Sequence, residues 1–248
     1  MKKILFSLVA LVASMSMNAQ VMKVMKNGQD TPVETYYGSD YYVVLEEAPA
    51  TTGTAVATIG GNDVNVGWVQ LWAGGPKFAE YNVGVTDGKA ESCGGLYCWG
   101  GSIDQDSNGA YKSGTDVLTG DDDTATNLWG NAWRMPTKDE LDALNELDAL
   151  YNYTNCDVTW TDSYNGSGVK GRIYTGKGDF ASNSIFLPAA GCFEDGDFQP
   201  NGTCFYWSST PNSNGYSYYM YFGQYTYGAN IRDTNRRTGY SVRAVLAE

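Results

Sequence analysis

The 248-residue sequence contains no histidine, which removes one of the commonest catalytic groups. Serine–histidine and cysteine–histidine nucleophile pairs, histidine general bases and histidine metal sites are all excluded. The sequence does not exclude a pair of catalytic carboxylates of the glycosidase type. However, none of the 28 acidic residues lies in a motif that identifies it as a member of such a pair. We therefore predict no catalytic residue, and a protein that is not an enzyme.

Basic residues are also few, with 16 lysines and arginines and a formal net charge of −12. A field of that sign repels phosphate backbones and anionic membranes, so nucleic acid is not an expected partner. The only long apolar run is near the N-terminus, and no transmembrane segment is predicted. Hydrophobic residues still make up 42% of the chain, which is sufficient for a sizeable core.

The N-terminal apolar run is typical of a secretory signal peptide. Lys2 and Lys3 precede an apolar stretch over residues 4–15, and Ala19 provides a small residue before cleavage at Gln20. The alternative is a buried N-terminal strand or helix. We expect residues 1–19 to be removed, which leaves 14 basic against 28 acidic residues. The product is then exported to the periplasm, the cell surface or the extracellular space.

Five cysteines occur in this chain, and an exported protein can keep disulfides. Cys93 with Cys98, and Cys192 with Cys204, are close enough in sequence to bridge a loop. The sequence does not determine the connectivity, and because the count is odd, at least one thiol is left over. The fifth cysteine is Cys156.

Composition divides the mature chain into three parts. Residues 20–47 predict a small β-hairpin, with a turn signal at Asn27-Gly28. Residues 48–65 predict a linker, or alternatively an edge strand over 54–59. Residues 66–248 predict one α+β domain with short strands, long loops and a single clear helix. The strands are expected at 66–72, 158–161, 169–174, 184–187, 205–208, 218–222 and 240–245.

The expected helix begins with a capping box, in which Thr137 is the N-cap and Glu140 lies three residues further on. Apolar residues at helical spacing then predict that one face of the helix continues to about residue 151. These residues are Leu141, Leu144, Leu147, Leu150 and Tyr151.

Four segments resemble, in order and spacing, the Fibrobacter succinogenes major paralogous domain family. They are residues 129–137 (WGNAWRMPT), 183–191 (NSIFLPAAG), 206–210 (YWSST) and 239–245 (GYSVRAV). Residues 81–85 with 95–100 resemble the opening motif of that family. The resemblance covers roughly residues 66–245 and implies a C-type-lectin-like fold, akin to the formylglycine-generating enzymes. It also implies an exported or surface protein, in some members with a role in adhesion or at a pilus tip.

The same motifs have a purely structural interpretation. Trp133, Phe186, Leu187 and Trp207 are expected in the core, because large apolar side chains are usually buried. Arg134 and Arg243 are expected as buried guanidiniums that bind loop carbonyls, because a loop-rich fold has many backbone groups to satisfy.

One acidic segment matches the opening of a calcium loop, with Asp104, Asp106 and Asn108 as the metal-ligating candidates. The twelfth position of such a loop is Thr115 rather than glutamate, and no helices flank the segment. Calcium is the only cofactor for which the sequence offers a place. The alternative is a solvated acidic turn.

The C-terminal region is rich in tyrosine among asparagine, serine and glycine, a composition typical of binding surfaces. Strand alternation places Tyr219 and Tyr221 on one face and Met220 and Phe222 on the other, so that one face is expected in the core. The ligand-binding candidates are Tyr216, Tyr218, Tyr219, Tyr221, Tyr225, Tyr227, Asn230 and Asn235.

Together these features predict an exported ligand-binding or adhesion module that recognises a glycan or a surface protein through its C-terminal aromatic and polar loops. One alternative is a structural or tip subunit of a pilus-like surface assembly. Another is an enzyme on a fold like that of the formylglycine-generating enzymes. The sequence leaves the oligomeric state open.

Overall fold

The computed structural model describes residues 20–26, 41–47, 50–105, 111–200, 202–226 and 230–247. The chain forms two compact units, Met1–Ala50 and Thr51–Glu248. In the first unit, β1 (Gln20–Lys26) pairs antiparallel with β2 (Tyr41–Glu47), where the sequence predicts a hairpin. The expected signal peptide lies outside the described residues. Within the described ranges, no helix has the length and apolar character needed to cross a membrane.

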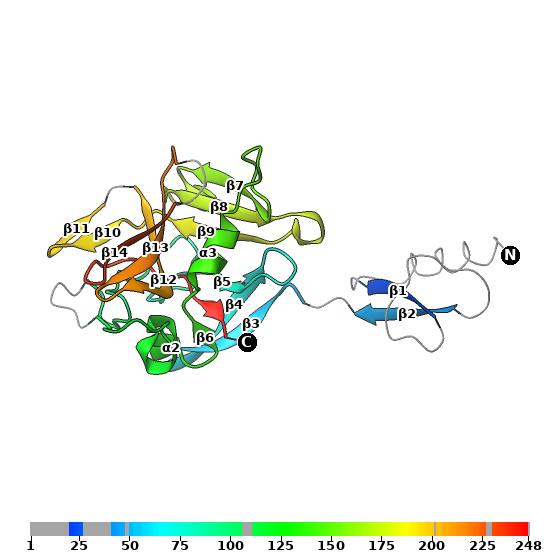
Figure 1. Ribbon diagram of the computed structural model, residues 1–248, viewed down its shortest axis with the longest axis horizontal. Coiled ribbons are helices and arrows are strands. Elements are labelled where there is room, and N and C mark those ends of the chain that lie inside the picture. Colours follow the sequence, from blue (N-terminus) through cyan, green and yellow to red (C-terminus); the bar gives the residue numbers. More distant parts are fainter. Residues whose placement is uncertain are drawn as a thin grey trace. The chain divides into compact units, whose positions relative to one another are not determined.

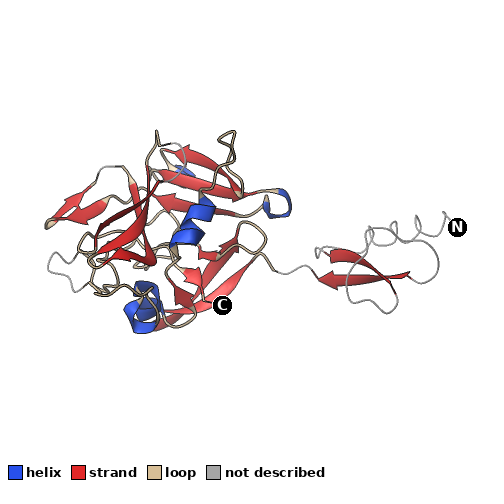
Figure 2. Ribbon diagram, viewed as in Figure 1, coloured by secondary structure: helices blue, strands red, loops and turns tan. Residues whose placement is uncertain are grey.

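The second unit is a β-rich α+β domain with several small sheets and long loops (Figures 1 and 2). Its largest sheet has five strands in the order β3-β4-β5-β15-β6. Their bounds are Thr52–Ile59, Asn62–Gln70, Lys77–Ala79, Val245–Leu246 and Trp133–Arg134. The strand expected over 240–245 is therefore mostly loop, tied in by isolated bridges such as Tyr97 to Tyr240.

Two further sheets have three antiparallel strands each, in the orders β7-β8-β9 and β12-β13-β14. A short hairpin, β10 (Cys192–Glu194) with β11 (Asp197–Gln199), completes the strands. The bounds of β7 to β9 are Cys156–Thr161, Gly171–Gly176 and Ser184–Pro188. Those of β12 to β14 are Cys204–Ser213, Tyr216–Phe222 and Asn230–Asn235. Each of the five strands expected between 158 and 222 overlaps one of these.

Of the two alternatives for residues 48–65, the edge strand over 54–59 is confirmed, and the linker is wrong for most of its length. Residues 52–59 form β3, which pairs with β4 along its whole length at the edge of the five-stranded sheet. Ala57 is fully buried, and the indole N–H of Trp133 donates to the carbonyl oxygen of Val56 at 3.0 Å. The small residues that suggested a linker instead suit close packing, since the Trp68 ring lies directly over Gly53. The domain begins at Thr51.

The strands β12 and β13 separate two hydrophobic clusters, so both faces of this strand pair carry buried residues, whereas β14 is mostly exposed. Trp207 and Tyr219 belong to the first cluster, whereas Tyr206, Met220 and Phe222 belong to the second. Successive side chains of a strand point to opposite faces, which is why neighbouring residues enter different clusters. The expected core positions are confirmed: Trp133, Phe186, Leu187 and Trp207 are each at most 1% exposed.

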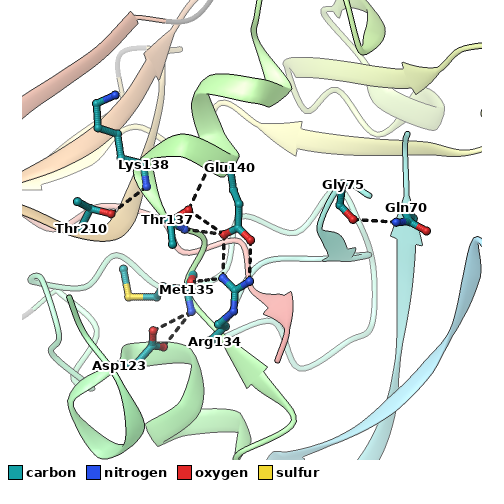
Figure 3. A network of polar contacts seen from close by, with 9 residues as sticks. All are labelled: Gln70, Gly75, Asp123, Arg134, Met135, Thr137, Lys138, Glu140 and Thr210. Carbon is teal, nitrogen blue, oxygen red and sulfur yellow. Dashed lines mark hydrogen bonds and ion pairs between the residues drawn. The ribbon is translucent and has the colours of Figure 1, made fainter. Parts of the chain in front are cut away.

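Helix α3 (Lys138–Leu144) begins with the expected capping box. The Thr137 hydroxyl accepts from the Glu140 N–H at 3.2 Å, and the Glu140 carboxylate accepts from the Thr137 N–H at 2.7 Å. Arg134 adds a bidentate pair to Glu140, with N–O distances of 2.6 and 2.8 Å (Figure 3). Burial alone would raise the pKa of Glu140, but the bonds from Arg134 and Thr137 outweigh it and lower the pKa.

A second short helix, α2 (Thr124–Trp129), is capped by Asp123, which is fully buried. Its carboxylate accepts from the N–H groups of Ala125 and Thr126, and also from that of Met135 at 2.8 Å (Figure 3). A single acidic side chain therefore joins the start of α2 to the segment that leads into α3.

The structure contains thiols and no disulfide among the described residues, which include all five cysteines. Four of the thiols are buried, and only Cys93 is exposed. Burial raises the pKa of Cys156 to about 12 and that of Cys204 well above its ordinary value. High pKa values and burial make these thiols unreactive in the folded protein.

We expect native protein, prepared without reductant, to react with one equivalent of a thiol reagent, at Cys93. Unfolding in guanidinium should expose all five thiols, because four are shielded only by the fold. The measurement is a thiol titration before and after denaturation, with Cys93→Ser as the control that abolishes the native signal. Three or fewer reactive thiols in denaturant would contradict this prediction.

Candidate functional site

A groove of about 580 Å³ opens beside β7 and β8, which are adjacent in Figure 1. Three segments form its walls: the loop after α3, the strand pair β7–β8, and the loop after β13. Its aromatic lining consists of Tyr151, Tyr153 and Trp160. Its polar and charged lining consists of Asn152, Asp157, Arg172, Lys177, Gln224 and Thr226.

The first wall exists because α3 ends earlier than its apolar pattern predicts. The helix stops at Leu144, and Asn145 follows as its C-cap. Asn145 is buried: its amide donates to the carbonyl of Leu141, and its side-chain oxygen accepts from the Tyr174 hydroxyl at 2.7 Å. Because these bonds hold Asn145 outside helical geometry, the expected helix over 145–151 is wrong, and these residues form a loop.

Asp148 organises the tip of this loop. Its carboxylate accepts from the N–H of Leu150 at 2.8 Å and from that of Asn152 at 2.9 Å. These bonds, led by those from Asn152, lower the pKa of Asp148. An aspartate that binds backbone N–H groups two and four residues ahead is a common turn device, and it was the sequence signal available here. The leucine spacing, which fits a helix, masked it.

The loop tip holds two large apolar side chains in solvent, Leu150 at 80% and Tyr151 at 68% exposed. Tyr151 has a φ of 63°, in the left-handed region that bulky residues rarely occupy. Backbone strain of this kind persists where surrounding bonds enforce it, and it is concentrated at functional sites. The result is an aromatic ring presented at the lip of the groove.

The strand pair β7–β8 forms the second wall. Val158 and Trp160 lie on one face of β7, opposite Tyr174 and Arg172 in the register of the two strands. Both residues are half-buried against the second hydrophobic cluster. The Trp160 indole N–H donates to Asp162 at 3.1 Å, which fixes the orientation of the ring.

Arg172 connects the walls, and its side chain is almost wholly buried. Its guanidinium donates to the carbonyl oxygens of Gly223, at 3.3 Å, and Thr226, both in the loop after β13. It also reaches the Tyr153 hydroxyl at 3.4 Å and lies 4.5 Å from the centre of the Phe222 ring. The contacts account for the position of the third wall, which carries Gln224 and Thr226 into the groove.

Lys177 and Asp157 form an ion pair on the groove surface, with 3.4 Å between Nζ and Oδ1. The Lys177 ammonium also donates to the carbonyl oxygen of Tyr153. The two side chains are 38% and 73% exposed, so both polar ends can be reached from solvent. The groove therefore offers a hydrogen-bond donor directly beside an acceptor.

Most of the residues predicted as ligand-binding lie on the adjacent strands β13 and β14, and not all of them are exposed. Tyr219 is only 8% exposed and packs in the first cluster against Trp207 and Tyr240. Burial raises the pKa of Tyr219. Tyr221, on the same strand face, is half-buried beside Phe205. The expected core face of β13 is confirmed, but the opposite face is covered as well, because a cluster lies on each side.

The remaining candidates range from half-buried to exposed, and Tyr216 lies opposite Asn235 in the register of β13 and β14. Tyr218 is half-buried and donates to Asn212 at 2.9 Å, while Tyr216 and Tyr225 are 47% and 92% exposed. Tyr225 follows Gln224 in the loop that forms the third wall. Asn230 and Asn235 are exposed at the two ends of β14. Tyr227 lies outside the described residues.

The structure describes only one of the three predicted calcium ligands, Asp104. Asp104 is exposed, and its Oδ1 accepts from the N–H of Leu96 at 2.7 Å. Asp106 and Asn108 lie outside the described residues. In the part of the chain that the structure covers, no three acidic or cysteine side chains form a group suited to a metal ion. Asp104 thus has a structural task in the loop before it.

Comparisons of the chain with protein-family models, with curated proteins and with solved structures found no match. The chemistry of the groove is therefore the basis on which a function can be assigned. Its lining combines exposed aromatic rings with amide, hydroxyl and carboxylate groups.

Proposed function

We propose that the protein is an exported module that binds glycans in the groove beside β7 and β8. Sugar rings are amphipathic, with C–H faces that stack on aromatic side chains and hydroxyl edges that hydrogen-bond. Tyr151 and Trp160 provide such faces, and Asn152, Asp157 and Gln224 provide hydrogen-bonding groups. The groove is open, and three separate segments line it. An open groove suits part of an oligosaccharide chain better than a small ligand that is fully enclosed.

The observation that carries the proposal is the exposure of Tyr151. A tyrosine that is 68% exposed, at a φ of 63°, gives the folded protein little packing in return for its strained backbone. A ligand that covers the ring explains both features. The neighbouring Leu150, at 80% exposure, extends the apolar lip that a ligand can cover.

We also assign the domain to the C-type-lectin-like fold of the Fibrobacter succinogenes major paralogous domain family. The order of the four family-like segments supports this assignment. So does the loop-rich α+β architecture with a capped helix after the WGNAWRMPT segment. Fold resemblance transfers location and scaffold more safely than function, so the glycan proposal depends on the groove alone.

A second candidate function, a subunit of a surface assembly, is favoured by the N-terminal hairpin. β1 and β2 form a two-stranded sheet in a compact unit of its own. An isolated two-stranded hairpin is marginal in water, and pairing with a strand of another protein would stabilise it. Self-association or partner capture that is lost when residues 20–47 are deleted, without glycan binding, would support this function instead.

Binding of the mature chain, residues 20–248, to a panel of plant and microbial oligosaccharides tests the glycan proposal. We expect at least one oligosaccharide to bind, and Tyr151→Ala or Trp160→Ala to weaken it about tenfold through lost stacking. Isothermal titration calorimetry measures both effects.

Tyr216→Ala is the matched control, because Tyr216 is also an exposed tyrosine but does not line the groove. It should bind like the unmodified protein. A panel without any binder, or equal losses in Tyr216→Ala and Tyr151→Ala, would contradict the proposal.

A further inference from the structure

We infer that the glycan is uncharged, and that Asp157 and Lys177 together form the subsite that binds two neighbouring hydroxyl groups of one sugar. This inference rests on the proposed function, since it names the class of ligand for the same groove. It follows from the partners that the charged side chains of the groove already have within the protein.

The ion pair has the chemistry that adjacent hydroxyl groups require. Each sugar hydroxyl can donate and accept, the Asp157 carboxylate only accepts, and the Lys177 ammonium only donates. One hydroxyl can therefore donate to Oδ1 of Asp157 while its neighbour accepts from Nζ of Lys177, which lies 3.4 Å from that oxygen. Hydrogen bonds with an ionised partner are the stronger kind.

The geometry of the pair is prepared before a ligand arrives. Lys177 is held by its bond to the carbonyl of Tyr153, a groove residue whose hydroxyl is reached in turn by Arg172. A flexible ammonium normally loses rotamer freedom on binding, and this anchoring reduces that loss. Asp157 projects from β7 and is 73% exposed, so its second oxygen remains accessible.

The two cations of the groove do not suit an anionic sugar. Arg172 is 3% exposed and uses its guanidinium to hold the loop after β13. Lys177 faces the carboxylate of Asp157, and its charge also contributes to the lowered pKa of Asp148. A uronate or sulfate group would have to enter beside these two carboxylates. The net charge of −12 on the whole chain adds to the repulsion.

A second solvent-accessible ion pair, away from the groove lining, provides an internal comparison. Lys112 and Asp122 are 2.5 Å apart, their side chains are 41% and 60% exposed, and neither residue lines the groove. Lys112→Gln therefore removes a surface charge of the same type without touching the subsite. Lys170 is unsuitable as a control, because its partner Asp162 also accepts from the Trp160 indole.

The experiment titrates the mature chain with neutral hexasaccharides of glucose, xylose and mannose, and with oligogalacturonate and chondroitin sulfate hexasaccharides. We expect a neutral hexasaccharide to bind, with an affinity that changes little between low and physiological salt. The anionic probes should bind at least about tenfold more weakly. Asp157→Asn and Lys177→Gln should each weaken binding of the neutral ligand about tenfold, and Lys112→Gln should leave it unchanged.

The outcomes separate the two proposals. Tighter, salt-sensitive binding of an anionic probe overturns this inference and leaves the glycan proposal in place. The same holds if Asp157→Asn and Lys177→Gln bind the neutral ligand like the unmodified protein. Binding by none of the five probes overturns this inference, while the wider oligosaccharide panel decides the proposed function independently. Unchanged thermal midpoints in both variants confirm that any loss is local.

Discussion

Replacement of Arg243 by alanine is expected to lower the free energy of unfolding by about 3–5 kcal/mol. Arg243 is 1% exposed and is surrounded by three acceptors from two separate segments. Its guanidinium donates to Oδ1 of Asn82 at 2.9 Å and to the carbonyl oxygens of Ala79 at 2.8 Å and Phe186 at 2.7 Å. Alanine leaves all three acceptors buried without a donor, in addition to a cavity.

The conservative variant Arg243→Lys should recover only part of this loss, because a single ammonium cannot reach three acceptors that a planar guanidinium satisfies together. Burial lowers the pKa of Arg243 to about 10, so the side chain remains protonated at neutral pH in the folded protein. The bonds are therefore charge-assisted throughout the physiological range.

Urea denaturation of the variants measures the effect. Arg232→Ala is the control, because Arg232 is exposed and its guanidinium lies 5.1 Å from the centre of the Tyr221 ring. It should change stability by less than about 1 kcal/mol. Similar losses in Arg232→Ala and Arg243→Ala would show that the buried contacts are not the cause.

The second large effect is expected at Asp123, where alanine should cost about 2–4 kcal/mol. The carboxylate is fully buried and accepts from Ala125 N–H at 2.9 Å, Thr126 N–H at 3.1 Å and Met135 N–H at 2.8 Å. Loss of this carboxylate removes the N-cap of α2 and leaves the buried N–H of Met135 without its acceptor. Asp121→Ala, two residues away and exposed, is the matched control and should be nearly neutral.

The pH dependence of this effect has a definite sign. Burial raises the pKa of Asp123, although the bonds from Met135, Thr126 and Ala125 act in the opposite direction. A carboxyl group with a raised folded pKa stabilises the protein fully below its unfolded pKa and loses that contribution as pH rises through the folded pKa. The stability difference between the unmodified protein and Asp123→Ala should therefore narrow from acid to neutral pH. A difference that widens would contradict the raised pKa.

Both predictions concern single polar side chains that hold several loops, and a third buried residue follows the same rule. Arg236 is fully buried, and the central carbon of its guanidinium lies 4.0 Å from the centre of the Trp99 ring. It donates to the carbonyl oxygens of Lys112, Ser213 and Tyr216 and to the Ser217 hydroxyl. In a domain with so many loops, backbone carbonyls that no strand satisfies need such donors.

Local patterns in the sequence were sufficient for much of the scaffold. Alternation and β-branched or aromatic runs located the strands between 158 and 222, and the Thr137–Glu140 spacing located the start of α3. Large apolar and aromatic residues indicated the core, and Arg243 was correctly interpreted as a buried donor to loop carbonyls. Arg134 was expected to be buried in the same way, but its side chain is 33% exposed and binds mainly the carboxylate of Glu140. These features depend on residues only a few positions apart, or on the general cost of exposing apolar surface.

Other features depended on contacts between distant segments. The helix after Thr137 stops at Leu144 because Tyr174, from β8, binds the side chain of Asn145. Tyr219 is in the core because the first hydrophobic cluster covers its face of β13, while the second cluster covers the opposite face. Sequence alternation did not show that both faces are covered. Residues 52–59 form a strand because β4 and the Trp133 indole provide hydrogen-bond partners for their backbone groups. Their composition also suits a linker.

The groove is the clearest case of what the tertiary structure alone decided. Its walls come from residues 151–153, 157–177 and 224–226, which are brought together by the bonds of Arg172 to Gly223 and Thr226. No periodicity links these three segments, and each one alone is an ordinary polar loop or edge strand. By itself the sequence determined a β-rich domain, its core and the start of its helix, because those follow from local spacing and burial. The binding surface required the fold, because it exists only where separate loops meet.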